Sequence, residues 1–117
     1  MKIHIKTQIA QDALRSVDED VQVVFRKYGN GRIGITLVDM DGVPFATGTV
    51  NVPEVDLAPD EVIIKDYSEN AGIEAALEAA GLIEITERMV QAGFEICSVS
   101  KLTPTAFDEI ERQGVKL

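Results

Sequence analysis

Residues 61–83 read EVIIKDYSENAGIEAALEAAGLI, and this stretch specifies more of the fold than any other part of the chain. Its three consecutive apolar residues at 62–64 predict a strand that is buried on both faces. One face of a following helix is predicted by apolar residues spaced at i, i+3, i+4 and i+7: Ile73, Ala76, Leu77 and Ala80. We expect Ser68 to cap this helix, which would begin near Glu69 and end at Gly81.

Residues 21–52 predict a three-stranded antiparallel meander. Apolar residues alternate along its first two strands, at Val21, Val23 and Phe25 and then at Ile33, Ile35 and Leu37. Asn30 and Gly31 between them form a strong hairpin signal, because both residues tolerate a positive φ. Asp41 and Gly42 mark a second turn, and the third strand follows over 43–52. Upstream, alternating apolar and polar residues predict a further strand over 2–8.

The C-terminal third predicts a hairpin and a final helix. Residues 84–101 predict strand, turn and strand, with the turn at 91–93, and Thr103 followed by Pro104 is typical of a helix start. The prolines and acids of 53–60 (PEVDLAPD) indicate a loop. The chain is therefore expected to be one α+β domain over 1–117. We expect a mainly antiparallel sheet of five or six strands, with the central amphipathic helix on one face and the C-terminal helix beside it.

The charge of the chain limits its partners. It has 117 residues and a formal net charge of -9. A strongly acidic surface repels phosphates, which argues against direct binding of DNA or RNA. The same surface attracts basic proteins, including proteins that themselves bind nucleic acid. The alternative is that the acids only keep a small protein soluble.

The cellular compartment is predicted from the cysteine count and the N-terminus. Cys97 is the only cysteine, so no internal disulfide can form, which favours a reducing compartment. The residues after Met1 alternate between apolar and polar, unlike a signal peptide, and no long apolar run follows. We therefore expect a cytoplasmic protein that does not contact a membrane.

The sequence predicts no catalytic residue, no cofactor and no metal site. The run 39–42 (DMDG) begins like a calcium loop, but the positions that need Gly and Glu hold Pro44 and Val50. The glycines of 29–34 (GNGRIG) precede a strand, whereas a nucleotide-binding loop lies between a strand and a helix. His4 is the only histidine and has no second metal ligand beside it. Cys97 has no basic neighbour in sequence that would lower its pKa.

The candidate partner-binding residues cluster around the predicted loop and helix start. They are Asp56, Asp60, Glu61, Asp66, Tyr67, Glu69 and Asn70. Acids that project from a loop and a helix N-terminus would face a basic partner, and a tyrosine is a common binding hot spot. A solvated acidic face is the alternative. Tyr28 is the other candidate anchor, and packing at the edge of the core is the alternative for both tyrosines.

Three stretches resemble a known family: 30–39 (NGRIGITLVD), 44–53 (PFATGTVNVP) and 65–72 (KDYSENAG). The family consists of small proteins without an assigned activity, encoded by bacteria, plasmids and phages, and the resemblance extends over 29–102. It implies no catalytic residue. It implies the setting of a mobile element, whose small acidic proteins include inhibitors that occupy the basic nucleic-acid channel of a host defence complex, as anti-CRISPR proteins do.

These observations predict a non-catalytic accessory factor that binds a basic protein partner, such as a host nucleic-acid-binding defence complex. A small enzyme or ligand-binding protein is the first alternative, with a polar pocket lined by Asp66, Tyr67 and Asn70. A homo-oligomeric structural protein joined through an exposed edge strand is the second.

Overall fold

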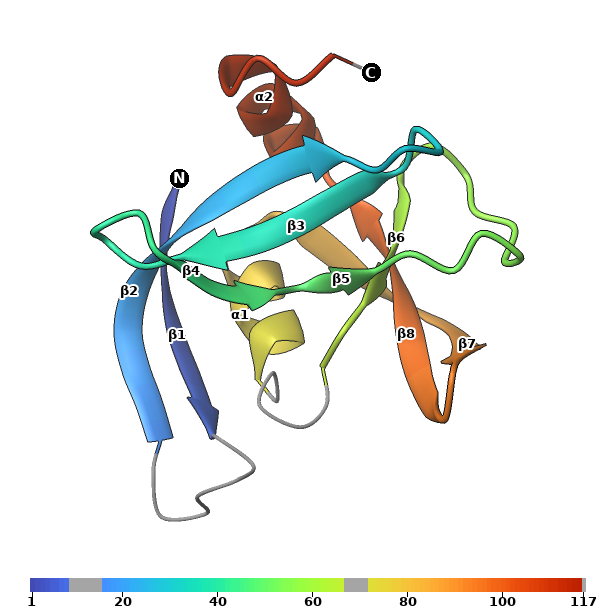
Figure 1. The fold of residues 1–117 in the computed structure, drawn as a ribbon, viewed down its shortest axis with the longest axis horizontal. Coiled ribbons are helices and arrows are strands. Elements are labelled where there is room, and N and C mark those ends of the chain that lie inside the picture. The colour runs from blue at the N-terminus through green and yellow to red at the C-terminus, as the bar shows by residue number, and fades with distance from the viewer. Residues whose placement is uncertain (9–15, 67–71, 117) are drawn as a thin grey trace.

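The computed structural model describes residues 1–8, 16–66 and 72–116 of the chain. These residues form an α+β fold with two antiparallel four-stranded sheets and two helices (Figure 1). The α+β class and the antiparallel pairing agree with the prediction. The single sheet of five or six strands is wrong, because the described residues contain eight strands divided between two sheets.

The first sheet has the strand order β1-β2-β3-β4. Its strands are β1 (Lys2–Gln8), β2 (Ser16–Lys27), β3 (Ile33–Val38) and β4 (Pro44–Thr47). Strand β2 begins earlier than the predicted meander did. Phe25 pairs with Ile35 and Val23 with Leu37, so the alternating apolar residues of the two strands share the buried face, as expected. The β2–β3 turn contains Gly31 at φ 88°, a conformation that favours glycine.

The second sheet has the strand order β5-β6-β8-β7. Its strands are β5 (Thr49–Val50), β6 (Glu61–Ile64), β7 (Ile83–Ala92) and β8 (Glu95–Leu102). The third strand predicted over 43–52 is split at Gly48 into β4 and β5, which join different sheets. Gly48 donates its N–H to the carbonyl of Ile35 (2.8 Å) and accepts from the N–H of Lys65 (2.8 Å). Its backbone therefore connects the two sheets.

Helix α1 (Ile73–Ala79) packs against β1 and β7. The predicted start near Glu69 is wrong, because the helix begins at Ile73. The N-cap residue is Gly72, which has no side chain to cap the helix. Ser68, the expected cap, lies outside the described residues. The carboxylate of Asp66 instead accepts the N–H groups of Gly72 and Glu74, each at 3.0 Å. Gly81 at φ 77° follows the helix end as predicted.

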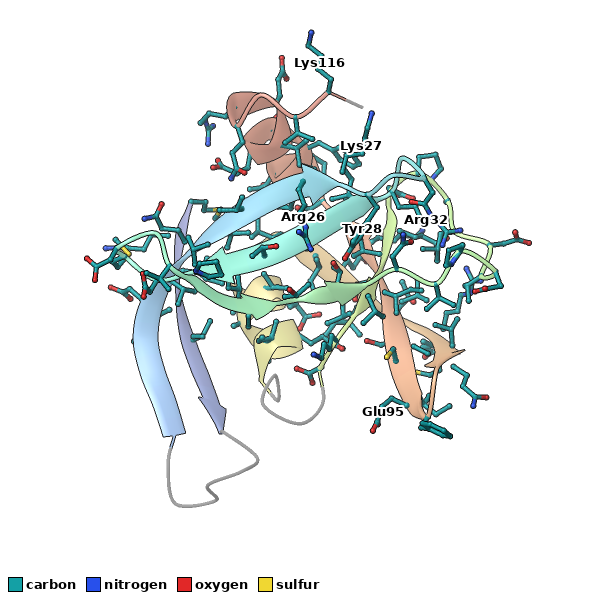
Figure 2. All side chains as sticks on the ribbon, in the orientation of Figure 1. Arg26, Lys27, Tyr28, Arg32, Glu95 and Lys116 are labelled. Carbon is teal, nitrogen blue, oxygen red and sulfur yellow. The ribbon has the colours of Figure 1, made fainter. Side chains whose placement is uncertain are left out.

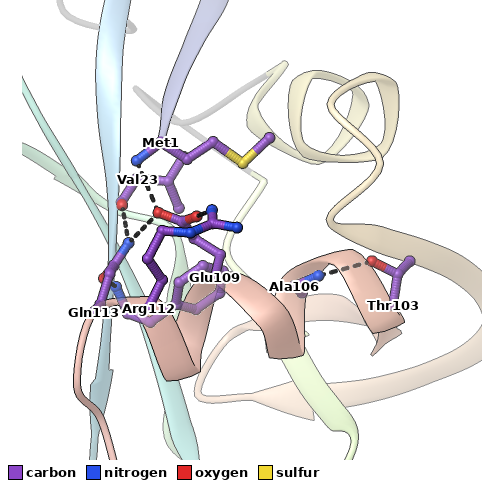
Figure 3. Close-up of polar contacts among 8 residues, drawn as sticks. Met1, Val23, Thr103, Ala106, Glu109, Arg112 and Gln113 are labelled. Atoms are coloured by element: carbon purple, nitrogen blue, oxygen red, sulfur yellow. Dashed lines mark hydrogen bonds and ion pairs between the residues drawn. The ribbon is translucent and has the colours of Figure 1, made fainter.

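Helix α2 (Pro104–Arg112) begins as predicted, with Thr103 accepting a hydrogen bond from the N–H of Ala106 (3.2 Å). Its C-terminal end is fastened to β2 through Gln113 (Figure 3). The Gln113 side chain accepts from the N–H of Phe25 and donates to the carbonyl of Val23, both at 2.8 Å. These two bonds link residues about 90 positions apart in sequence, so the helix is held directly against the first sheet.

The core has two parts. The main cluster joins the inner faces of both sheets with α1 and α2, and includes Val62 and Ile64 of β6. Ile63 points to the opposite side, where it packs with Cys97 and Val99 beneath residues 50–57. The prediction that 62–64 are buried on both faces is confirmed. Neither helix in the described part of the chain is long and apolar enough to cross a membrane.

Candidate functional site

The predicted partner-binding residues lie at the two ends of β6. Asp56, Asp60 and Glu61 are at its start, and Asp66 follows its end. Asp66 is five positions after Glu61, and an extended chain of that length spans about 16 Å. The predicted acids therefore do not form one continuous cluster. The remaining three predicted residues, Tyr67, Glu69 and Asn70, lie outside the described residues. Partner binding by this set stays a prediction.

At the start of β6, Glu61 holds the preceding loop in place. Its carboxylate accepts the N–H of Ala58 (2.7 Å) and pairs with Arg88 of β7 (3.4 Å). Arg88 also donates to the backbone carbonyl of Asp56 (2.6 Å), and Arg32 donates to two further carbonyls of the same region. Glu61 therefore has a structural role, while the side chain of Asp56 is left exposed to solvent.

At the other end of β6, Asp66 borders a surface depression of about 260 Å³. The depression lies between the start of α1 and the β7–β8 hairpin. Its polar side contains the carboxylates of Asp66 and Glu74 together with Ser98, whose hydroxyl donates to Glu74. Its apolar side contains Ile85, Met89 and Ile96. The site thus combines two negative charges with aliphatic surface.

The apolar side chains of this depression are unusually exposed. Met89 is 54% exposed and Ile96 is 59% exposed, and Phe94 at the hairpin turn is fully exposed. The register of the hairpin places Met89 and Ile96 on one face of the sheet, because Met89 pairs with Ser98 and Gln91 with Ile96. Phe94 is in the turn that joins the two strands. We call the surface formed by Ile85, Met89, Phe94 and Ile96, with Asp66 and Glu74, the hairpin face.

A bulge in β7 decides which charges reach the hairpin face. The register shifts between Ile85 and Met89, so that residues 86–88 lie opposite Val99. The Thr86 hydroxyl donates to the carbonyl of Val99 and accepts the N–H of Arg88 (3.2 Å). Because Arg88 turns to the other side of the sheet to reach Glu61, neither Lys nor Arg is among the residues that line the depression.

A few charged residues can be located in Figure 2. Figure 2 shows Glu95 at the end of the β7–β8 hairpin and Lys27 and Lys116 on the opposite side of the molecule, near α2. Arg26 and Arg32 lie in the region of the β2–β3 hairpin.

The other reactive side chains have ordinary structural positions. His4 is exposed, with Nδ1 2.8 Å from the carboxylate of Asp20, and its hydrogen bond lowers the pKa of that carboxyl. Cys97 is buried, and burial followed by the charge of Glu95 raises the pKa of its thiol. Among the described residues, no three His, Cys, Asp or Glu side chains are grouped so as to hold a metal ion.

Most of the hairpin face was not predicted. The alternation of Phe94, Ile96 and Ser98 was visible in the sequence, and in most sheets such a face would be buried. Its exposure depends on where α1 begins and on the bulge in β7, neither of which has a clear signal in the sequence. Of the four predicted binding residues within the described part of the chain, Asp66 alone belongs to the hairpin face.

Comparisons of the chain with protein-family models, with curated proteins and with solved structures give no significant match. The family resemblance of residues 29–102 therefore stays a prediction.

Proposed function

We propose that the protein is a non-catalytic protein-binding module, and that the hairpin face is its contact surface. The observation that carries this proposal is that three large apolar side chains of one hairpin are exposed: Met89 and Ile96 on one face of the sheet, and Phe94 at the turn between the strands. Burying a phenylalanine side chain is worth about 1.5–3 kcal/mol, and Phe94 contributes none of this to folding. Clustered exposed apolar residues of this kind are typical of binding surfaces.

The charges beside these residues favour a basic partner. Asp66 and Glu74 line the same depression, and Glu95 adjoins Phe94 in sequence. Such a surface attracts a protein that presents Lys or Arg next to apolar side chains. It disfavours the surface of an anionic bilayer, for which basic residues would be needed.

A more specific form of the proposal is that the partner itself binds nucleic acid. Its cationic surface would accept carboxylates in place of phosphates, and the net charge of -9 supports this idea. The protein would then act as a competitor of nucleic acid, for example as an inhibitor of a host defence complex.

The test compares proteins captured from host lysate by four purified baits: the parent, Phe94→Ala, Met89→Ala and Met40→Ala. Met40 is a matched control because it is 53% exposed on the β3–β4 turn, away from the hairpin face. A partner retained by the parent and the control but lost from the other two supports the proposal. Its release by added salt, and its displacement by a DNA or RNA oligonucleotide, would support the charge argument and the competitor role respectively. Identical capture by all four baits would overturn the proposed surface.

A further inference from the structure

Strand β7 has an open edge. It is the last strand of the second sheet, and within residues 1–8, 16–66 and 72–116 only β8 pairs with it. The strand at the far end of the first sheet, β1, is packed against α1. Along β7 only Ile83, at the end near α1, is fully buried, and the rest of the strand is exposed or half-buried.

The two halves of β7 differ in how well they could accept another strand. The first half contains Glu84, Glu87 and the bulge at 86–88, which are devices that protect a sheet edge from pairing. The second half, 89–92 (MVQA), pairs with β8 in unbroken register and contains no charge, proline or glycine. The open and regular part of the edge is therefore the part that borders the hairpin face.

The side chains next to this edge define what an added strand would carry. Side chains on one face of an added strand would lie beside Met89, Gln91 and the depression with Asp66 and Glu74. An apolar residue there would contact Met89. A basic residue two positions along faces the same side, because every second residue of a strand does so, and its long side chain would extend across Met89 toward the carboxylates on the β6 and β8 side of the depression.

Building on the proposed function, we infer that the partner binds by strand addition. An extended segment, with basic and apolar residues at alternate positions of one face, pairs with the backbone of β7 at 89–92. Main-chain hydrogen bonds supply affinity in this mode and the alternate side chains supply specificity.

The probe is the peptide KTVTKTVTK, which as a strand places its Lys and Val residues on one face and its Thr residues on the other. ETVTETVTE is the charge control, and KKKTTTTVV keeps the composition but removes the alternation. We expect KTVTKTVTK to bind the intact protein at least about tenfold more tightly than either control, since both the charge and the pattern contribute.

Two measurements identify strand addition. Backbone N–H groups of successive residues in a strand point to opposite sides, so two of the four amides at 89–92 face the open edge. These two should exchange with solvent at least about tenfold more slowly when the peptide is bound. Two N-methylated peptides, one modified at odd positions and one at even positions, should differ. The peptide whose methyl groups block the N–H groups that face β7 should bind about tenfold or more weakly, and the other should lose little affinity.

The outcomes separate this inference from the proposed function. Salt-sensitive binding of KTVTKTVTK that depends on Phe94 and Met89, without new amide protection or register dependence, would overturn strand addition and leave the binding face intact. Equal or weaker binding of the basic peptide relative to the acidic one would overturn both. A dimer of the free protein, with the amides at 89–92 already protected, would show that a second copy pairs with the edge and would also overturn the inference.

Discussion

The ring of Tyr28 lies directly over Gly34, so close that a Cβ atom at Gly34 would be 2.9 Å from Cε2 of the ring. The Tyr28 hydroxyl is 2.8 Å from Oγ1 of Thr49, and that oxygen also accepts the N–H of Ile35 (3.1 Å). Arg26 lies above the ring, 5.5 Å from its centroid (Figure 2). The missing side chain at Gly34 thus allows Tyr28, which directly follows β2, to reach Thr49 in β5 of the second sheet.

This packing predicts that Gly34→Ala is destabilising. The new methyl group forces the ring of Tyr28 to move, and overpacking of this kind costs about 1–3 kcal/mol of unfolding free energy. Gly29→Ala is the matched control, because a Cβ there meets nothing within 4 Å. Denaturant unfolding of both variants measures the difference. In a Tyr28→Ala background Gly34→Ala should cost much less, and an equal cost in both backgrounds would show that the ring is not the obstacle.

A second prediction concerns Asp66, which both caps helix α1 and supplies a negative charge to the hairpin face. Its carboxylate accepts two backbone N–H groups at the start of α1, so Asp66→Ala should lower the unfolding free energy by about 0.5–2 kcal/mol. Asp66→Asn keeps an acceptor oxygen and should retain most of that stability while it removes the charge. Asp56→Ala is the control, since only the backbone carbonyl of Asp56 contacts Arg88. If Asp66→Ala unfolds at the same denaturant concentration as the parent, the carboxylate does not cap the helix.

Local signals in the sequence predicted the individual elements better than their assembly. The alternation of Ile33, Ile35 and Leu37, and the Thr103 cap, correspond to short-range interactions and are confirmed. The division of one predicted strand at Gly48 was missed because its pairing partners, Ile35 and Lys65, are distant in sequence. The candidate site was largely missed for a similar reason. An apolar residue such as Ile96 reads the same whether its face is covered or open, and only the packing of other elements decides which.

A third prediction concerns acid stability and Glu109, which is buried at the end of α2 (Figure 3). The hydrogen bond from Gln113, followed by that from the Met1 ammonium group (3.1 Å), lowers the pKa of this carboxyl against the opposing effect of burial. A carboxyl whose pKa is lowered in the folded state contributes its full stabilisation at pH values above its ordinary pKa of 4.5. That stabilisation is lost as the pH falls through the folded-state pKa.

We therefore expect Glu109→Gln to be less stable than the parent at neutral pH, with a difference that shrinks as the pH falls below about 4.5. Unfolding free energies measured between neutral and acidic pH test this. Glu111→Gln is the control, because Glu111 is on the exposed face of α2. A difference between parent and Glu109→Gln that does not change with pH would contradict the assignment.

A fourth prediction concerns the reactivity of Cys97. Its thiol is buried beneath residues 50–57, and the raised pKa leaves little thiolate, which is the reactive form, at neutral pH. An aromatic disulfide reagent should therefore modify the native protein far more slowly than the denaturant-unfolded protein. The ratio of the two rates, followed by absorbance, is the measurement. Equal rates would mean that the cluster around Cys97 opens readily to solvent.

The last prediction separates binding from folding at Phe94. Since this side chain is fully exposed, Phe94→Ala should change the unfolding free energy by less than about 0.5 kcal/mol. A residue at the centre of a contact surface, by contrast, commonly contributes about 2 kcal/mol or more to affinity, so the same variant should bind its partner about thirtyfold more weakly. Met40→Ala should change neither quantity. Calorimetric binding and denaturant unfolding of both variants provide the comparison, and a Phe94→Ala protein with full affinity would exclude this hairpin as the contact surface.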